Sequence, residues 1–101
     1  MAYSATTQTR LAHPATLRRF RTRPALEFIQ ATRRPLYCGE FGVIDRAPRE
    51  SAHRWYRDFL GLMRDYKIGR AAWSYKLMDF GLVDRDGRVV DEELLKIVTQ
   101  K

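Results

Sequence analysis

One glutamate lies at a position where a carboxylate could act in catalysis. Glu40 follows the short apolar run of residues 35–39 and lies between Gly39 and Gly42. Pro35 and Gly39 bound this run, and an apolar segment so bounded predicts a buried strand. The carboxyl ends of the strands in parallel α/β structures form the active face, and glycines there let a substrate come close. Glu40 is therefore a candidate nucleophile or general base; the alternative is an edge carboxylate in a turn.

A tryptophan occupies the corresponding place on a second strand. Residues 68–75 have strand-like composition, and Trp73 lies near their carboxyl end. An aromatic side chain at the end of a strand is more often part of the core than a binding platform. Beside an acid on the adjacent strand, however, an indole offers a flat apolar face of the kind on which sugar rings stack.

The histidines and the single cysteine do not indicate metal or thiol chemistry. His13 and His53 are isolated in the sequence, and we expect both to be solvated rather than catalytic. Cys38 is expected to be a small buried residue, because no histidine is suitably placed to activate its thiol. Tyr37 is expected in the core. These residues do not share the spacing of a metal site, so the sequence predicts neither a metal nor a cofactor.

Three amphipathic helices are expected to position the strands. They span residues 24–34, residues 51–66 with Ser51 as the cap, and residues 91–99 with Asp91 as the cap. The middle helix carries an apolar stripe at helical spacing, formed by Trp55, Phe59, Leu62, Met63 and Tyr66. A turn is expected over residues 84–87, where Asp-Arg-Asp-Gly occurs.

The order helix, strand, helix, strand, helix predicts a parallel strand pair joined by a crossover helix. Parallel strands need cover on both faces, and two strands are marginal by themselves. The chain is therefore expected to be a section of a larger α/β structure. With open strand edges and partly exposed helix faces, it is also expected to self-associate or to be partly molten.

Most of the net positive charge lies in the amino-terminal third of the chain. It has 101 residues and a net charge of +7, and residues 1–34 hold seven arginines and one acid, which leaves +1 for the remainder. Residues 1–23 are expected to be a basic, disordered leader, and residues 24–101 the folded domain. The arginines at 18, 19, 21 and 23 are interpreted as a solvated tail rather than a nucleic-acid patch, since Phe20 is the single aromatic among them.

The sequence contains no apolar run long enough to span a membrane and no apolar segment typical of a secretory signal. The expectation for the chain as written is therefore a cytoplasmic location without a membrane partner.

Four segments in order carry a resemblance to a known family. They are LYCGEFG at residues 36–42, WYRDF at residues 55–59, AAWSYK at residues 71–76 and FGLVD at residues 80–84. Together they resemble the carboxyl-terminal part of glycoside hydrolase family 5, to which many endoglucanases (cellulases) belong, over about residues 24–98 of this chain. The resemblance implies a fragment of a (β/α)8 TIM barrel that holds helix 6, strand 7, helix 7, strand 8 and helix 8. Relatives in that family are often secreted.

The same resemblance implies a site. Glu40 matches the nucleophile after strand seven, and Trp73 matches the aromatic that lines the sugar site beside it. Lys76 and Asp79 are then expected to bind sugar hydroxyls from the last loop; the alternative is a salt-bridged loop. The implied substrate is a β-glucan or related polysaccharide, hydrolysed at its glycosidic bonds with retention of configuration.

Half of the implied catalytic pair is missing from these residues. A retaining glycosidase needs two carboxyl groups about 5–5.5 Å apart. The family's acid is the glutamate of an Asn-Glu pair after strand four, and this sequence contains no asparagine. The other glutamates fall on predicted helices or their approaches; they are Glu27, Glu50, Glu92 and Glu93. We therefore expect no turnover by this chain alone, unless a second chain supplies the other strands.

Two further hypotheses stay open. One is a small basic module that binds nucleic acid or acidic partners through its arginine-rich start. The other is a non-functional gene remnant.

Overall fold

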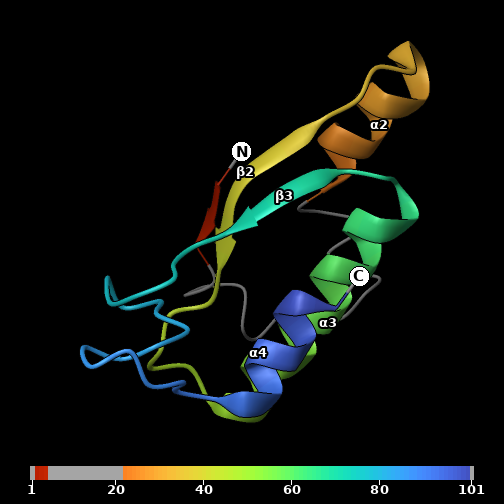
Figure 1. The fold of residues 1–101 in the computed structure, drawn as a ribbon. Coiled ribbons are helices and arrows are strands. Elements are labelled where there is room, and N and C mark those ends of the chain that lie inside the picture. The colour runs from red at the N-terminus through yellow and green to blue at the C-terminus, as the bar shows by residue number, and fades with distance from the viewer. Residues whose placement is uncertain (1, 5–21, 101) are drawn as a thin grey trace.

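A computed structural model describes residues 2–4 and 22–100. The elements follow in the order β1 (Ala2–Ser4), α2 (Arg23–Thr32), β2 (Tyr37–Gly42), α3 (Arg49–Asp65), β3 (Gly69–Ala72) and α4 (Glu92–Thr99). The three strands form one parallel sheet in the order β1-β2-β3, so β2 is its central strand. Figure 1 shows α3 and α4 on the same side of this sheet. In the same view, α2 lies at one end of the sheet, and the loops that follow β2 and β3 lie at the opposite end.

The predicted helices are present with shifted ends. Helix α2 begins at Arg23 behind Thr22, and it ends at Thr32 because Arg33 takes a left-handed conformation with φ of 59°. Helix α3 begins at Arg49, before the predicted Ser51, and Pro48 occupies its cap position without a side-chain hydrogen bond. The prediction of Ser51 as the cap was therefore wrong.

The core lies between β2 and the helices. Trp55, Phe59 and Phe41 stack in sequence: the ring centroids of Trp55 and Phe59 are 4.8 Å apart, and those of Phe59 and Phe41 are 5.2 Å apart. All three rings are buried, and α4 adds Ile97. The predicted stripe on α3 is confirmed in this core, although Tyr66 is only partly buried. Tyr37, expected in the core, is 63% exposed instead.

One element was not predicted. The structure places Ala2–Ser4 in a strand that pairs with β2, and Thr22 is buried. Residues 1, 5–21 and 101 lie outside the described part, so the division of the chain at residue 23 stays a prediction. His13 and four of the five leader arginines fall in that range; the fifth, Arg23, donates to Glu27 at 2.7 Å on the surface of α2.

The turn over residues 84–87 is confirmed. Asp84 Oδ1 accepts hydrogen bonds from the backbone N–H groups of Asp86 and Arg88, both at 2.9 Å. Gly87 supplies the left-handed conformation that the turn requires, with φ of 83°. Among the residues that the structure describes, no helix is long and apolar enough to cross a membrane.

Candidate functional site

Glu40 lies inside a strand rather than after it. The sequence placed a strand over residues 35–39, whereas β2 begins at Tyr37 and continues to Gly42. Pro35 has no N–H to donate to a ladder, which explains the later start. At the other end, pairing of β1 with β2 from Glu40 to Gly42 prolongs the ladder beyond the predicted end.

An irregularity in β2 sets the face on which Glu40 stands. Cys38 pairs with Arg70 and Phe41 with Ala72, so β2 has one more residue than β3 between the two pairs. An extra residue of this kind is a β-bulge, and it breaks the alternation of side chains. Cys38 and Phe41, three residues apart, are consequently both buried on the helix side of the sheet.

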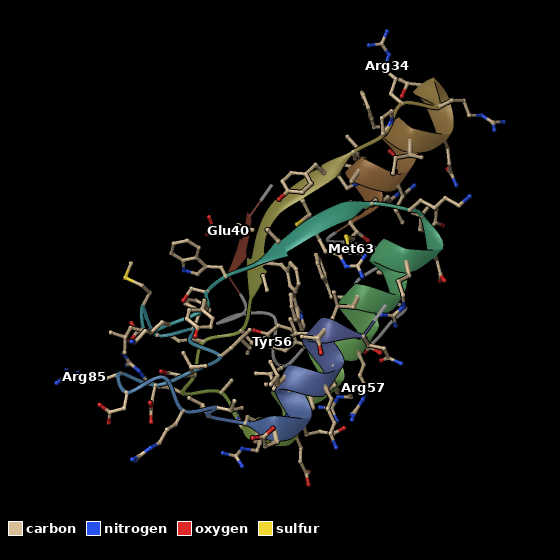
Figure 2. All side chains as sticks on the ribbon, in the orientation of Figure 1. Arg34, Glu40, Tyr56, Arg57, Met63 and Arg85 are labelled. Carbon is tan, nitrogen blue, oxygen red and sulfur yellow. The ribbon has the colours of Figure 1, made fainter. Side chains whose placement is uncertain are left out.

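Glu40 falls within this bulge and is partly exposed. The Cys38 thiol donates to the Glu40 carbonyl oxygen at 3.4 Å, which ties the bulge together. Figure 2 shows the Glu40 side chain on the side of the sheet away from α3 and α4. We call this side the open face. Bulges often redirect side chains next to active sites, and the sequence alone gave no sign of this one.

The backbone holds Trp73 beside Glu40. Strand β3 ends at Ala72, earlier than predicted, and the Trp73 N–H donates to the Phe41 carbonyl at 2.7 Å. A Cβ atom on Gly42 would lie 2.4 Å from the Trp73 carbonyl oxygen, so only glycine permits this approach. Trp73 is 39% exposed, and its bond to Ser74 is a cis peptide. An exposed indole and a partly exposed carboxylate thus stand near the carboxyl ends of neighbouring strands.

Lys76 and Asp79 lie in the loop that follows β3. Both side chains are exposed, and neither forms a hydrogen bond or ion pair within the described residues. The Asp79 carbonyl accepts a hydrogen bond from the Asp45 N–H at 2.7 Å, which joins the loops after β2 and β3. Within the described part of the chain, the salt-bridged loop considered as an alternative finds no ion pair at these two side chains.

The sequence analysis missed a cluster between α3 and α4. Asp91 caps α4 as predicted, and its Oδ1 accepts from the Leu94 N–H at 3.1 Å. Its Oδ2 accepts from His53 Nε2 at 2.6 Å and lies 3.4 Å from Arg49 Nε. The His53 side chain is only 13% exposed, so the expectation that it is solvated was wrong.

The electrostatics of Asp91 follow from these contacts. Burial acts to raise the pKa of Asp91, but the hydrogen bonds from His53 and Leu94 and the nearby charges of His53 and Arg49 outweigh it. The pKa consequently lies below its ordinary value of 3.8. One signal was present in the sequence: Arg49, His53 and Arg57 recur every four residues on one face of α3, opposite the acidic start of α4.

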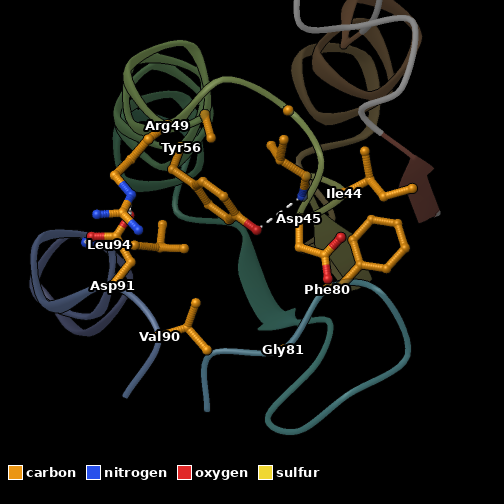
Figure 3. Close-up of a pocket in the computed structure, with 12 residues that line it drawn as sticks. Ile44, Asp45, Arg49, Tyr56, Phe80, Gly81, Val90, Asp91 and Leu94 are labelled. Carbon is orange, nitrogen blue, oxygen red and sulfur yellow. Dashed lines mark hydrogen bonds and ion pairs between the residues drawn. The ribbon is translucent and has the colours of Figure 1, made fainter. Parts of the chain in front are cut away.

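A cavity of about 100 Å³ adjoins this cluster (Figure 3). The loop after β2 and the first turns of α3 line it, together with residues 80, 81, 90, 91 and 94. Within it, the Tyr56 hydroxyl accepts from the Val43 N–H at 2.9 Å, and burial raises the pKa of Tyr56 above 10. Neither Glu40 nor Trp73 is among the residues that line this cavity.

The described residues include no group of three or more histidine, cysteine, aspartate or glutamate side chains placed to hold a metal ion. The candidate site offers one partly exposed carboxylate, with an exposed tryptophan next to the neighbouring strand. A carboxylate so placed can act as a nucleophile or as a base, and it needs a second group to complete an acid–base reaction.

Two endoglucanases and one solved endoglucanase structure are similar to this chain. Endoglucanase C of Acetivibrio thermocellus and Endoglucanase C307 of Clostridium sp. (strain F1) are each 43% identical to this chain over 79 residues, which are 78% of the chain. The match spans 23% of the length of either relative. No protein-family model matches the chain. A solved endoglucanase structure superimposes with a TM-score of 0.70 and 18% identity, over 94% of this chain and 28% of the other.

These likenesses confirm the resemblance drawn from the sequence. The chain is similar to the carboxyl-terminal portion of an endoglucanase. The structural match at low identity speaks for the fold alone, and it agrees with a fragment of a barrel. The chain spans less than a third of the proteins that it matches, so their activity is a proposal here.

Proposed function

We propose that residues 24–101 are the end of a (β/α)8 barrel that hydrolyses β-1,4-linked glucan with retention of configuration. In this proposal, β2 and β3 are strands seven and eight of the barrel, and α2, α3 and α4 are its last three helices. The observation that carries it is the position of Glu40 on the open face, the side that would face the interior of a closed barrel, with the exposed Trp73 on the neighbouring chain segment bonded to Phe41. The 43% identity to two endoglucanases supports it.

Glu40 is the nucleophile in this mechanism. One oxygen of its carboxylate attacks the anomeric carbon while a second carboxyl group gives its proton to the leaving glycosidic oxygen. Water, deprotonated by that second group, then attacks the same carbon and releases Glu40. Trp73 offers its ring face to the sugar at the point of attack, and Lys76 and Asp79 bind hydroxyl groups from the adjoining loop.

The second carboxyl group is proposed to come from outside these 101 residues. Glu27 and Glu93 are bound to Arg23 and Arg57 on helix surfaces, at 2.7 and 2.8 Å. Glu50 and Glu92 are exposed in the first turns of α3 and α4. All four lie on the helices, so none can face the substrate together with Glu40, and the chain by itself is expected to be inactive.

The remaining strands of the proposed barrel would pair with the edges of this sheet. Strand β1 covers one edge of β2 over three residues only, and β3 forms the opposite edge of the sheet. Both edges can extend a parallel ladder. A complementing barrel segment is the partner proposed for them, and in its absence a second copy of the chain would compete for the same edges.

The test combines the chain with the upstream segment of Endoglucanase C, which supplies the other strands. We expect no hydrolysis of an aryl cellobioside by either piece and measurable hydrolysis by the mixture. Glu40→Gln should abolish it, whereas Asp45→Asn, at an exposed acid in the loop after β2, should retain most of it. A 2-deoxy-2-fluoro aryl cellobioside should leave a covalent sugar on Glu40, seen by peptide mass spectrometry. Turnover that survives Glu40→Gln would refute the assignment.

A further inference from the structure

An arginine lies on the helix side of the strand at the edge of the sheet. Strand β3 is that edge strand, and Arg70 in β3 pairs in register with Cys38, which is buried on the helix side. Partners in a parallel ladder share a face, so Arg70 also points toward the helices. It lines a groove of about 270 Å³ between β3 and the end of α4. The residues that line this groove with it are Phe41, Ala72, Val98, Thr99 and Gln100.

Arg70 has no counter-charge in this groove. It is partly buried, and its guanidinium forms no hydrogen bond or ion pair within the part of the chain that the structure describes. By contrast, Arg23, Arg49 and Arg57 each contact a carboxylate. None of the described residues that line the groove is acidic. Water can solvate the guanidinium while the groove is open, but a partner that covered the groove without supplying a negative charge would bury an unpaired cation, which is strongly unfavourable.

The outer edge of β3 is a place where a strand can be added. Its backbone groups on that side have no partner strand among residues 2–4 and 22–100. A strand added in parallel would lie about 4.8 Å from β3, so its helix-facing side chains would lie beside Arg70. A helix connected to such a strand would pack next to α4 and cover the groove.

Charge complementarity decides which strand fits this edge. A second copy of the chain could offer its own β3, but this strand would bring a second Arg70 and therefore a like charge. It could instead offer its β1, Ala2–Ser4, which carries no charged side chain. Either strand would extend the ladder and leave the guanidinium uncompensated. A segment that carries a carboxylate beside Arg70 would satisfy both the ladder and the charge.

We propose that Arg70 determines the specificity of the joint between this chain and the rest of the barrel, by forming an ion pair with an aspartate or glutamate of the segment that pairs with β3. The inference rests on the proposed function, since the partner is the complementing barrel segment. It adds a requirement for a negative charge at one position, which backbone pairing alone does not impose.

The experiment co-expresses the full chain with the upstream segment of Endoglucanase C, so that the two can fold together, and measures dissociation of the purified complex by analytical ultracentrifugation. Arg70→Gln should weaken the complex about tenfold and Arg70→Glu about a hundredfold, because the charge is first lost and then reversed. Arg70→Lys keeps the charge and should stay within about threefold of the wild type. Higher salt should weaken the wild-type complex more than that of Arg70→Gln.

Arg64→Glu is the matched control. Arg64 is exposed on α3 and does not line the groove, so the same reversal of charge there should change the dissociation constant less than about threefold. Circular dichroism checks that each variant is folded. If Arg70→Glu is not, the comparison of Arg70→Gln with Arg70→Lys still decides, since equal dissociation constants for these two would refute the ion pair.

A charge exchange identifies the partner residue. Each aspartate and glutamate in the strand and helix of the upstream segment that adjoin β3 is changed to lysine, one at a time. One of these changes should restore the complex with Arg70→Glu to within about tenfold of the wild type. If none restores it, or if Arg70→Glu binds like the wild type, the ion pair is refuted.

Hydrolysis of an aryl cellobioside by the same complexes separates the two proposals. If the wild-type complex is active and the Arg70 variants bind equally well, the ion pair is refuted while the proposed function stands. If Arg70→Glu weakens the complex and a charge exchange restores it, but the wild-type complex is inactive, the ion pair is supported while the proposed activity fails. If no complex forms, both fail. If Arg70→Glu alters only the association of the chain with itself, the edge is a contact between copies and the ion pair is likewise refuted.

Discussion

Removing the side chain of Asp91 should weaken the contact between α4 and α3 and lower the stability of the fold. In Asp91→Ala the helix loses its cap to Leu94, worth about 1 kcal/mol. It also loses the hydrogen bond between His53 and the carboxylate, worth about 1.5–3 kcal/mol for a charged acceptor. Because the two side chains are only 13% and 11% exposed, water does not replace this bond. We expect the free energy of unfolding to fall by about 3 kcal/mol, a large share of the total for a small domain.

Two other variants separate the contribution of the Asp91 cap from that of its charge and from that of an exposed ion pair. Asp91→Asn keeps a good capping side chain but removes the charge, so it should cost less than Asp91→Ala. Glu93→Gln removes the ion pair with Arg57, in which both side chains are at least half exposed, and should cost under about 1 kcal/mol. The assay is urea unfolding followed by circular dichroism at 222 nm, at fixed salt. Equal losses for Asp91→Ala and Glu93→Gln would refute the reasoning.

The pH dependence gives a second check on Asp91. Its pKa is lowered in the folded state, so between the folded and unfolded pKa values the unfolded chain binds more protons, and stability rises with pH there. The contribution is therefore complete above about pH 4 and is lost as the pH falls through the lowered pKa. The gap in stability between the wild type and Asp91→Asn should shrink below pH 4; a gap that stays constant down to pH 2.5 would contradict this account.

Other substitutions test the packing behind the site. Gly42→Ala should cost about 2–3 kcal/mol, because the new Cβ would meet the Trp73 carbonyl, whereas Gly61→Ala, with open space around it, should be neutral or stabilising in urea unfolding. Tyr56→Phe should cost about 1–2 kcal/mol, since the buried Val43 N–H loses its acceptor; a variant as stable as the wild type would argue against that hydrogen bond. In absorbance titration at 295 nm, the tyrosine signal that Tyr56→Phe removes should ionise above pH 10.

Local sequence patterns predicted much of the fold. The three helices, the cap at Asp91 and the turn at Asp84 were predictable because each depends on residues within one or two turns of chain. The neighbourhood of Glu40 and Trp73 also followed from the sequence, since parallel strands bring their carboxyl ends to one edge. The resemblance of four sequence segments to a known family added the likeness to endoglucanases, which periodicity alone does not contain.

Tertiary structure decided the rest. Pairing with β1 extended β2 past Glu40, and the bulge against β3 turned Glu40 to the open face; both depend on strands distant in the chain. His53 and Asp91 are 38 residues apart, so their contact forms only when α3 and α4 pack together. In the loop after β3, Leu77, Met78 and Asp79 take left-handed conformations where backbone and Ser74 hydrogen bonds close the loop. Sequence determines which residues prefer a helix or strand, but register, facing and long-range pairing are settled only when the elements pack together.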